Sequence, residues 1–66
     1  MKMVLLKLYD RKTKELIATV TATRNMSIDD ILNLMHYALD EEGRVVDANG
    51  ELLNAWYDNL VIYGEV

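Results

Sequence analysis

The chain has 66 residues and a mass of 7.6 kDa, with 52% hydrophobic and 27% charged residues, which is the profile of one small folded domain. It contains no cysteine and one histidine, so a disulfide framework, a thiolate nucleophile, a cysteine zinc site and a histidine-rich metal centre are excluded. We therefore expect no cofactor and no metal. No apolar run approaches the length of a membrane span, and the opening run at residues 1–6 is too short for a secretory signal, so we expect a cytoplasmic protein that does not bind membranes.

The net charge of −4 conceals an uneven distribution of charge along the chain. Residues 1–24 carry six basic and two acidic groups, a net of +4, whereas residues 25–66 carry one basic and nine acidic groups, a net of −8. A folded chain of this kind can present fields of opposite sign on opposite faces, which affects its choice of partner. The alternative is that both sets are solvated surface groups that keep a small domain soluble.

Two N-terminal strands are predicted at residues 3–9 and 15–23, because apolar and polar residues alternate there with a period of two. In the second segment Leu16 and Ala18 fall on one face, whereas Ile17 falls on the other with the threonines. The polar segment 10–14 is short enough to close an antiparallel hairpin. Asp10 can start its turn by accepting backbone N–H groups ahead of it.

A helix is predicted at residues 27–41, where Ser27 and Asp30 have the spacing of a capping box. Gly43 suits the left-handed position that follows a helix. The predicted C-terminal turn carries acidic residues, which the helix dipole disfavours, so we expect either fraying there or a nearby cation such as Arg44. One face carries an apolar stripe at helical spacing, made of Ile28, Ile31, Leu32, Met35, Ala38 and Leu39.

The path of residues 44–59 stays open at this level. Asn49-Gly50 is a strong hairpin signal that could turn a strand at residues 45–48 back onto residues 51–53. Residues 54–59 are expected to form a loop or a single helical turn. The continuous apolar run at residues 60–63 predicts a strand at the centre of a sheet, covered or paired on both sides.

This order of elements predicts a single α+β domain over residues 1–66, a two-layer ββαβ(β) arrangement with a mixed sheet of three to four strands and one helix on one face. The order resembles the ubiquitin-like β-grasp, which implies a last strand beside the first and parallel to it. The chain ends Gly64-Glu65-Val66, without the Gly-Gly tail of a conjugated modifier, so the resemblance implies no conjugation. The acidic helix, the Asn-Gly turn and the segment 56–60 also look similar to small proteins of Gram-positive bacteria and their phages, a resemblance that implies no activity.

The sequence contains no motif typical of an enzyme, and we expect a non-enzymatic protein without a small-molecule substrate. His36 would lie four residues before Asp40 on the predicted helix, but no serine, cysteine or lysine is placed for activation, so we interpret it as a surface or structural residue. A metal site on this pair would need further ligands. Residues 47–51 lack the spacing of a calcium loop and are interpreted as a turn.

Three features favour a protein-binding module that uses the uncovered sheet face and an edge strand. A single helix can cover only one face of the hairpin, which leaves apolar residues on the other. The strand at residues 15–23 would be an unpaired edge that could accept another chain. Trp56-Tyr57 has the composition of an interface anchor, and the alternative is that Trp56 caps the end of a small core. The candidate contact residues are Met3, Leu5, Tyr9, Ile17, Tyr37, Trp56 and Tyr57. The partner would be another protein or a second copy of the chain, and ordinary surface apolar content is the alternative.

A nucleic-acid-directed regulator is the second, less favoured hypothesis. In one form the basic hairpin tip binds nucleic acid, with Tyr9 available to stack on a base. In the other form the acidic helix, with Asp29, Asp30 and residues 40–42, mimics phosphate and occupies the cleft of a DNA-binding protein. The basic candidates are Lys7, Arg11, Lys12, Lys14 and Arg24.

Overall fold

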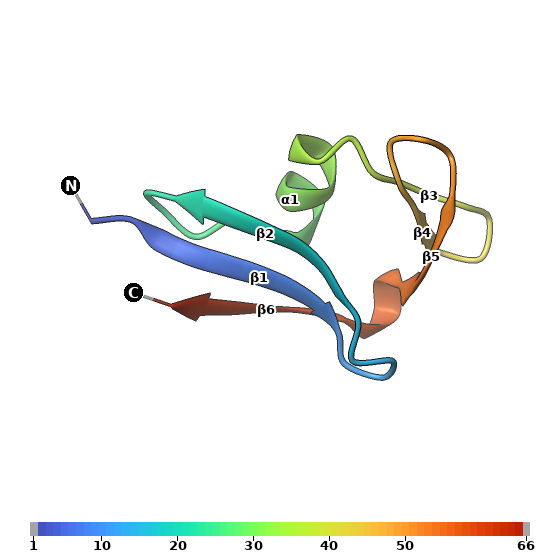
Figure 1. Cartoon of the computed structure of the whole chain (residues 1–66), viewed down its shortest axis with the longest axis horizontal. Helices are drawn as coiled ribbons and strands as arrows, with labels where there is room; N and C mark the ends of the chain where they lie inside the picture. Colours follow the sequence, from blue (N-terminus) through green and yellow to red (C-terminus); the bar gives the residue numbers. More distant parts are fainter. Residues whose placement is uncertain (1, 66) are drawn as a thin grey trace.

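The computed structural model describes residues 2–65, which form one helix, one 3-10 turn and two antiparallel sheets of three strands each (Figure 1). An α+β domain is therefore confirmed. The predicted single mixed sheet is wrong, because the second half of the chain builds a sheet of its own. The elements, in chain order, are β1 (Val4–Asp10), β2 (Leu16–Ala22), α1 (Ile28–Leu34), β3 (Ala38–Leu39), β4 (Arg44–Val46), β5 (Leu52–Trp56), η1 (Tyr57–Asn59) and β6 (Leu60–Glu65).

The first sheet has the strand order β2-β1-β6, and both neighbours of β1 run antiparallel to it. The predicted hairpin of β1 and β2 is confirmed. The last strand lies beside the first, as a β-grasp implies, but it is antiparallel rather than parallel, and it is an edge strand rather than a central one. Its run Leu60–Tyr63 alternates between a buried and an exposed side, with Leu60 6% and Tyr63 57% exposed. The sequence differs from a conjugated modifier at the end of the chain, and the last residue there, Val66, lies outside the described residues.

Helix α1 is half as long as predicted. Its start is as expected: the Ser27 hydroxyl accepts the backbone N–H of Asp30, whose carboxylate accepts the N–H of Ser27 in return. It ends at Leu34 because His36 takes a left-handed conformation with φ of 60°. The N–H of His36 then donates to the carbonyl of Asn33 and the N–H of Tyr37 to that of Leu32, the bond pair of a Schellman C-cap.

Stopping the helix at this point corrects several expectations. Ala38 and Leu39 form the edge strand β3, which pairs with β4, instead of continuing the apolar stripe. The acidic residues 40–42 are not helical, so they experience no helix dipole and form no acidic helix with Asp29 and Asp30. His36 and Asp40 are likewise not one helical turn apart. Gly43 does adopt a left-handed conformation, with φ of 81°, but within the turn before β4 rather than at the helix end.

The second sheet, β3-β4-β5, is organised by two short turns that aspartates close. Asp40 Oδ1 accepts the backbone N–H groups of Glu42 and Arg44, which bends the chain between β3 and β4. Asp47 Oδ1 accepts those of Asn49 and Glu51 in the hairpin between β4 and β5. The predicted Asn-Gly hairpin is thus confirmed, but the returning strand is longer than expected and includes Asn54 to Trp56; only η1 matches the expected helical turn.

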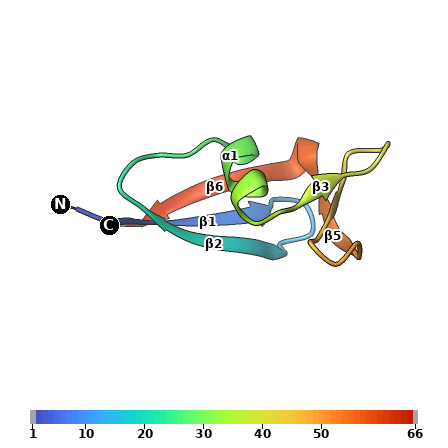
Figure 2. The same cartoon turned by 90° about the horizontal axis from the view of Figure 1, so that it is seen from above.

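The hydrophobic core lies between the first sheet and α1 and continues into the second sheet (Figure 2). Helix α1 covers one face of the first sheet, while the other face carries no described element. Each fully buried large aliphatic side chain contributes about 1.5–3 kcal/mol relative to exposure, which matters in a domain this small. The buried hydrophobic residues are Leu6, Leu8, Ile17, Ala18, Val20, Ile31, Leu32, Val45, Ala55 and Leu60.

Candidate protein-interaction surface

The strand register brings apolar residues from three strands together on the uncovered side of the first sheet. Residues directly opposite each other in a sheet point to the same face. Tyr9 is opposite Leu16 on β2 and Val61 on β6, while Leu5 and Tyr63 lie further along the same faces of β1 and β6. We call Leu5, Tyr9, Leu16, Val61 and Tyr63 the outer face.

Several side chains on this side of the molecule are open to solvent. Leu16 is 46% and Tyr63 57% exposed, and Met3, which precedes β1, is 49% exposed. The other three residues of the outer face are half-buried by their neighbours. Lys7 lies among them, opposite Thr19 and Tyr63. This side of the sheet therefore combines the apolar outer face with Lys7 and with the exposed threonines Thr19 and Thr21 of β2.

The prediction that Ile17 belongs to this surface is wrong. The register shifts between Leu8, which pairs with Ala18, and Tyr9, which pairs with Leu16. Ile17 is the extra residue of the resulting β-bulge and is only 8% exposed, within the core cluster. Because a bulge reverses the alternation on one side of it, Leu16 turns outward and takes the place predicted for Ile17.

Three further predicted contact residues belong to other elements and already have intramolecular partners. The Tyr37 hydroxyl donates to the carbonyl of Ile17 at 3.1 Å, and this half-buried residue packs against the core. The Trp56 ring lies under the Arg44 guanidinium, 4.9 Å from the ring centre. A hydrogen bond to the Asp29 carboxylate, then the charge of that group, raises the pKa of Tyr57 above its ordinary value of 10.0. The structure does not bring these three residues into the outer face.

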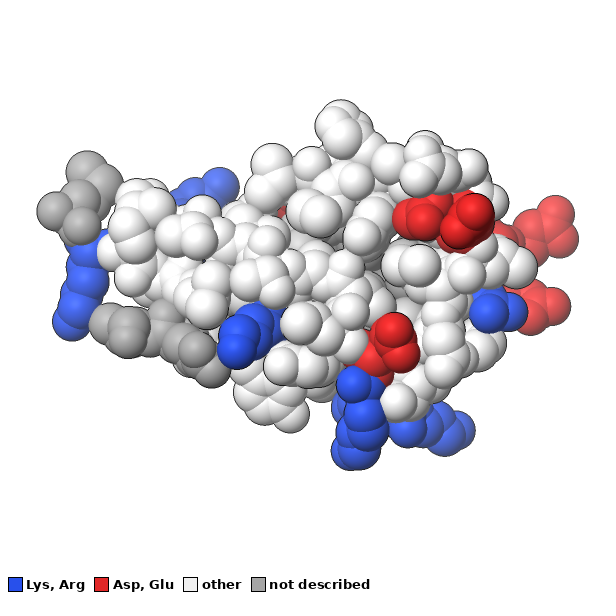
Figure 3. Space-filling view, viewed as in Figure 1, with Lys and Arg blue, Asp and Glu red and all other residues white. Residues whose placement is uncertain are grey.

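The basic candidates fall into two groups. Arg11, Lys12 and Lys14 are exposed on the hairpin loop, next to the end of the outer face that carries Tyr9. Lys7 lies within the outer face, whereas Arg24 follows the far end of β2. In Figure 3 most of the acidic side chains lie over the right-hand end, the region of the second sheet. Basic side chains lie at the left-hand end, near the centre and along the lower margin.

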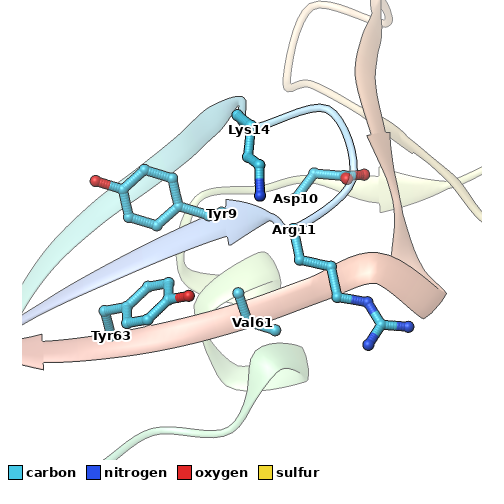
Figure 4. Close-up of a pocket in the computed structure, with 6 residues that line it drawn as sticks. All are labelled: Tyr9, Asp10, Arg11, Lys14, Val61 and Tyr63. Carbon is cyan, nitrogen blue, oxygen red and sulfur yellow. The ribbon is translucent and has the colours of Figure 1, made fainter.

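A groove of about 240 Å³ opens where the outer face meets the hairpin loop, and we call it the tyrosine groove (Figure 4). The rings of Tyr9 and Tyr63 meet edge to face, with centroids 5.5 Å apart and planes at 75°. The residues that line the tyrosine groove are Tyr9, Asp10, Arg11, Lys14, Val61 and Tyr63. Figure 4 shows the Asp10 carboxylate turned away from the two rings.

Asp10 is 0% exposed, and its carboxylate is satisfied by backbone donors. Oδ1 accepts the N–H groups of Lys12 and Thr13 at 2.8 and 2.9 Å, and Oδ2 accepts that of Trp56 at 2.9 Å. Burial on its own would raise the pKa of Asp10, but the donors from Thr13, Trp56 and Lys12 outweigh it and lower the pKa below the ordinary 3.8. The group is therefore an ionised structural link, not an acid or base available to a substrate.

The hairpin loop is held against η1 and β5 by further bonds. The Arg11 N–H donates to the carbonyl of Asn59 at 2.8 Å, and the Thr13 hydroxyl donates to that of Asn54 at 2.7 Å. A second, more polar groove of about 460 Å³ lies at this junction and is lined by Lys12, Thr13, Glu42, Trp56, Asp58 and Asn59. These bonds fix the loop, and with it the position of the basic residues beside the tyrosine groove.

The sequence did not reveal Leu16, Val61 and Tyr63 as surface residues of one face. Strict alternation places Leu16 on the face of Ala18, and the continuous apolar run at residues 60–63 predicts a central strand, covered or paired on both sides. A signal was present for Tyr63, since it follows Val61 at the spacing of one strand face. No sequence signal places β6 next to β1 in antiparallel register.

Comparisons with protein-family models, with curated proteins and with solved structures find no match to this chain. Among residues 2–65, no group of three or more histidine, cysteine, aspartate or glutamate side chains is placed to hold a metal ion. None of the helical segments described has the length and apolar character needed to cross a lipid bilayer.

Proposed function

We propose that this protein is a non-enzymatic interaction module that binds another protein, or a second copy of itself, through the outer face of its first sheet and the adjoining edge strand β2. The observation that carries the proposal is the register of β1 with β2 and β6. It gathers Leu5, Tyr9, Leu16, Val61 and Tyr63 on the face opposite the helix.

Exposed apolar area on a small domain favours association. Covering a large apolar side chain is worth about 1.5–3 kcal/mol when burial is complete, and aromatic residues are typical interface anchors. Leu16 and Tyr63 are each about half exposed, so a partner could bury much of both. Strand β2 pairs only with β1 among the described strands, so its outer edge offers backbone groups for strand addition.

The proposal is tested with the double variant Leu16→Ser, Tyr63→Ser. Both side chains are already half solvated, so the fold is expected to survive, which circular dichroism and urea unfolding would confirm. Light scattering over a concentration series reports self-association, and affinity capture from cells that produce the protein reports other partners. We expect the double variant to lose the association that the unmodified chain shows.

Leu34→Ser is the matched control, because Leu34 is 54% exposed but lies on the helix. It removes a similar exposed apolar side chain from another surface and is expected to leave association unchanged. If the control and the double variant behave alike, or if the double variant keeps every partner, the outer face is not the binding surface.

Nucleic-acid binding is the second candidate, favoured by the groove in which Tyr9 and Tyr63 lie next to Arg11 and Lys14. In this role the two cations would contact phosphate and a tyrosine would contact a base. The test is binding of single-stranded DNA at low and high salt, since phosphate contacts weaken steeply with salt. Salt-sensitive binding that is lost in Arg11→Glu, Lys14→Glu would support it, whereas its absence would leave the protein-binding role. The phosphate-mimic form has less support, because residues 40–42 are not on the helix with Asp29 and Asp30.

A further inference from the structure

We infer that the tyrosine groove binds an extended acidic peptide segment that inserts an apolar side chain between the groove walls. This inference rests on the proposed role of the outer face, gives the partner a chemistry, and places the partner's backbone at the edge of β6 instead of β2. The peptide would place its apolar anchor against Tyr9, Tyr63 and Val61. Its flanking carboxylates would meet Arg11 and Lys14.

The size of the groove favours a side chain over a free small molecule. Pockets for cofactors and drug-sized ligands are typically about 300–1,000 Å³ and enclose most of the ligand. The tyrosine groove measures about 240 Å³ and opens onto the surface of the sheet. A space of this size holds one or two side chains, which suits a peptide whose remaining atoms lie along the surface.

The charge around the groove favours acidic flanking residues. Two exposed cations, Arg11 and Lys14, stand at its rim, and the charged groups of both are not already bonded within the fold. The third ionised group, Asp10, is saturated by three backbone N–H donors and points away from the rings. Complementary charge of this kind selects partners and speeds encounter more than it adds affinity.

The edge of the sheet gives the peptide a place for its backbone. Val61 and Tyr63 line the groove from β6, which pairs only with β1 among the described strands. A peptide that adds to the free edge of β6 would direct every second side chain to the same side as Val61 and Tyr63. An extended segment at this edge can therefore pair its backbone with β6 while its side chains lie on the side of Val61 and Tyr63.

The ring geometry favours a peptide anchor over stacked nucleotides. Proteins that bind single strands offer ring faces on which successive bases stack. Here the two rings stand at 75° to each other, so they present a corner and not a common platform. A single strand carries a charge at every nucleotide, whereas two exposed cations, Arg11 and Lys14, line this groove, a number that suits a peptide with a few carboxylates.

A phage-displayed library of random octapeptides, selected on the immobilised full chain, tests the inference. We expect the selected pool to be enriched in aspartate and glutamate around one apolar residue. The double variant Arg11→Glu, Lys14→Glu should not select this pool. The matched control is Lys2→Glu, Arg24→Glu, which makes the same charge change at exposed residues away from the groove and should select it.

A labelled synthetic copy of the most enriched peptide then gives affinities by fluorescence anisotropy. We expect Arg11→Glu, Lys14→Glu to weaken binding on the order of tenfold or more, and the control to change it little. A pool without acidic enrichment, an equal pool on the charge-reversed variant, no enrichment at all, or tighter binding of a sixteen-nucleotide poly-dT would each overturn the inference. If it fails while Leu16→Ser, Tyr63→Ser still abolishes association, the proposed function stands. If that double variant changes nothing, the proposed function fails by itself.

Discussion

Asp10 and Trp56 are joined by a hydrogen bond of 2.9 Å that links the two sheets across 46 positions of sequence. The donor is the Trp56 backbone N–H and the acceptor is Oδ2 of a carboxylate with no exposed surface. The other oxygen of the same group closes the β1–β2 turn. One side chain thus shapes the hairpin loop and fastens it to β5, which positions the basic residues beside the tyrosine groove.

Replacing Asp10 with asparagine is expected to destabilise the fold by about 2–3 kcal/mol, because an amide cannot accept on both sides and its NH₂ would face the Trp56 donor. A 66-residue domain has a total stability of about 3–10 kcal/mol, so the loss is a large part of it. Urea unfolding measures the change. Asp47→Asn is the control: Asp47 closes its turn through Oδ1 alone, so little loss is expected. Equal losses in both variants would show that the link to Trp56 adds nothing.

The stability contributed by Asp10 should depend on pH. Its pKa is lowered in the folded state from 3.8, so the stabilisation is fully present above that value and is lost as the pH falls through the lower folded pKa. Unfolding free energies measured at neutral pH and at steps below pH 4 would show this loss in the unmodified chain. The Asp10→Asn variant should lack the part of this acid-dependent loss of stability that comes from Asp10. An identical acid dependence in both proteins would assign the effect to other carboxylates.

His36→Gly is expected to stabilise the protein by about 0.5–1 kcal/mol. His36 has a φ of 60° at the end of α1, a conformation that glycine adopts without a Cβ penalty. Asn33→Gly, within the helix, is the opposite control and should cost about 0.3 kcal/mol. Thermal or urea unfolding compares the two. A destabilised His36→Gly would mean that the imidazole makes a contact that outweighs the backbone strain.

Because of the bulge in β2, alanine substitution of two neighbouring residues should have very different effects on stability. Ile17→Ala should cost about 2–5 kcal/mol, because Ile17 is 8% exposed within the core. Leu16→Ala removes a side chain that is 46% exposed and should change stability by less than about 1 kcal/mol. Unfolding free energies of the two variants test the register directly. A larger loss of stability in Leu16→Ala than in Ile17→Ala would contradict the bulge and support strict alternation along β2.

The local chemistry of the sequence predicted much of the fold. The hairpin turn at Asp10, the cap at Ser27 and the Asn-Gly turn all depend on residues within a few positions, and each is found as expected. Features set by distant residues were not predictable. The helical stripe continues through Leu39, yet pairing with β4 draws that segment into a strand. The sheet order and the antiparallel direction of β6 follow from tertiary packing.

The candidate surface was predicted only in part for the same reason. Leu5 and Tyr9 share one face of β1 as expected, because alternation holds along that strand, and Met3 is exposed just before it. Ile17 was misplaced because a bulge inserts one residue and exchanges the faces at the end of β2. Val61 and Tyr63 belong to the surface because β6 pairs with β1, and the sequence does not indicate that pairing. Strand register, which no local pattern specifies, decides the composition of this face.

The most direct test of the outer face as a binding surface is one capture experiment. The immobilised unmodified chain, Leu16→Ser, Tyr63→Ser and Leu34→Ser are each incubated with extract of the producing cells and an added tagged copy of the chain. The amount of every retained protein is then measured. We predict that at least one species, the tagged copy included, is retained by the unmodified chain and by Leu34→Ser but lost from the double variant. Equal retention by all three would contradict the role assigned to this face.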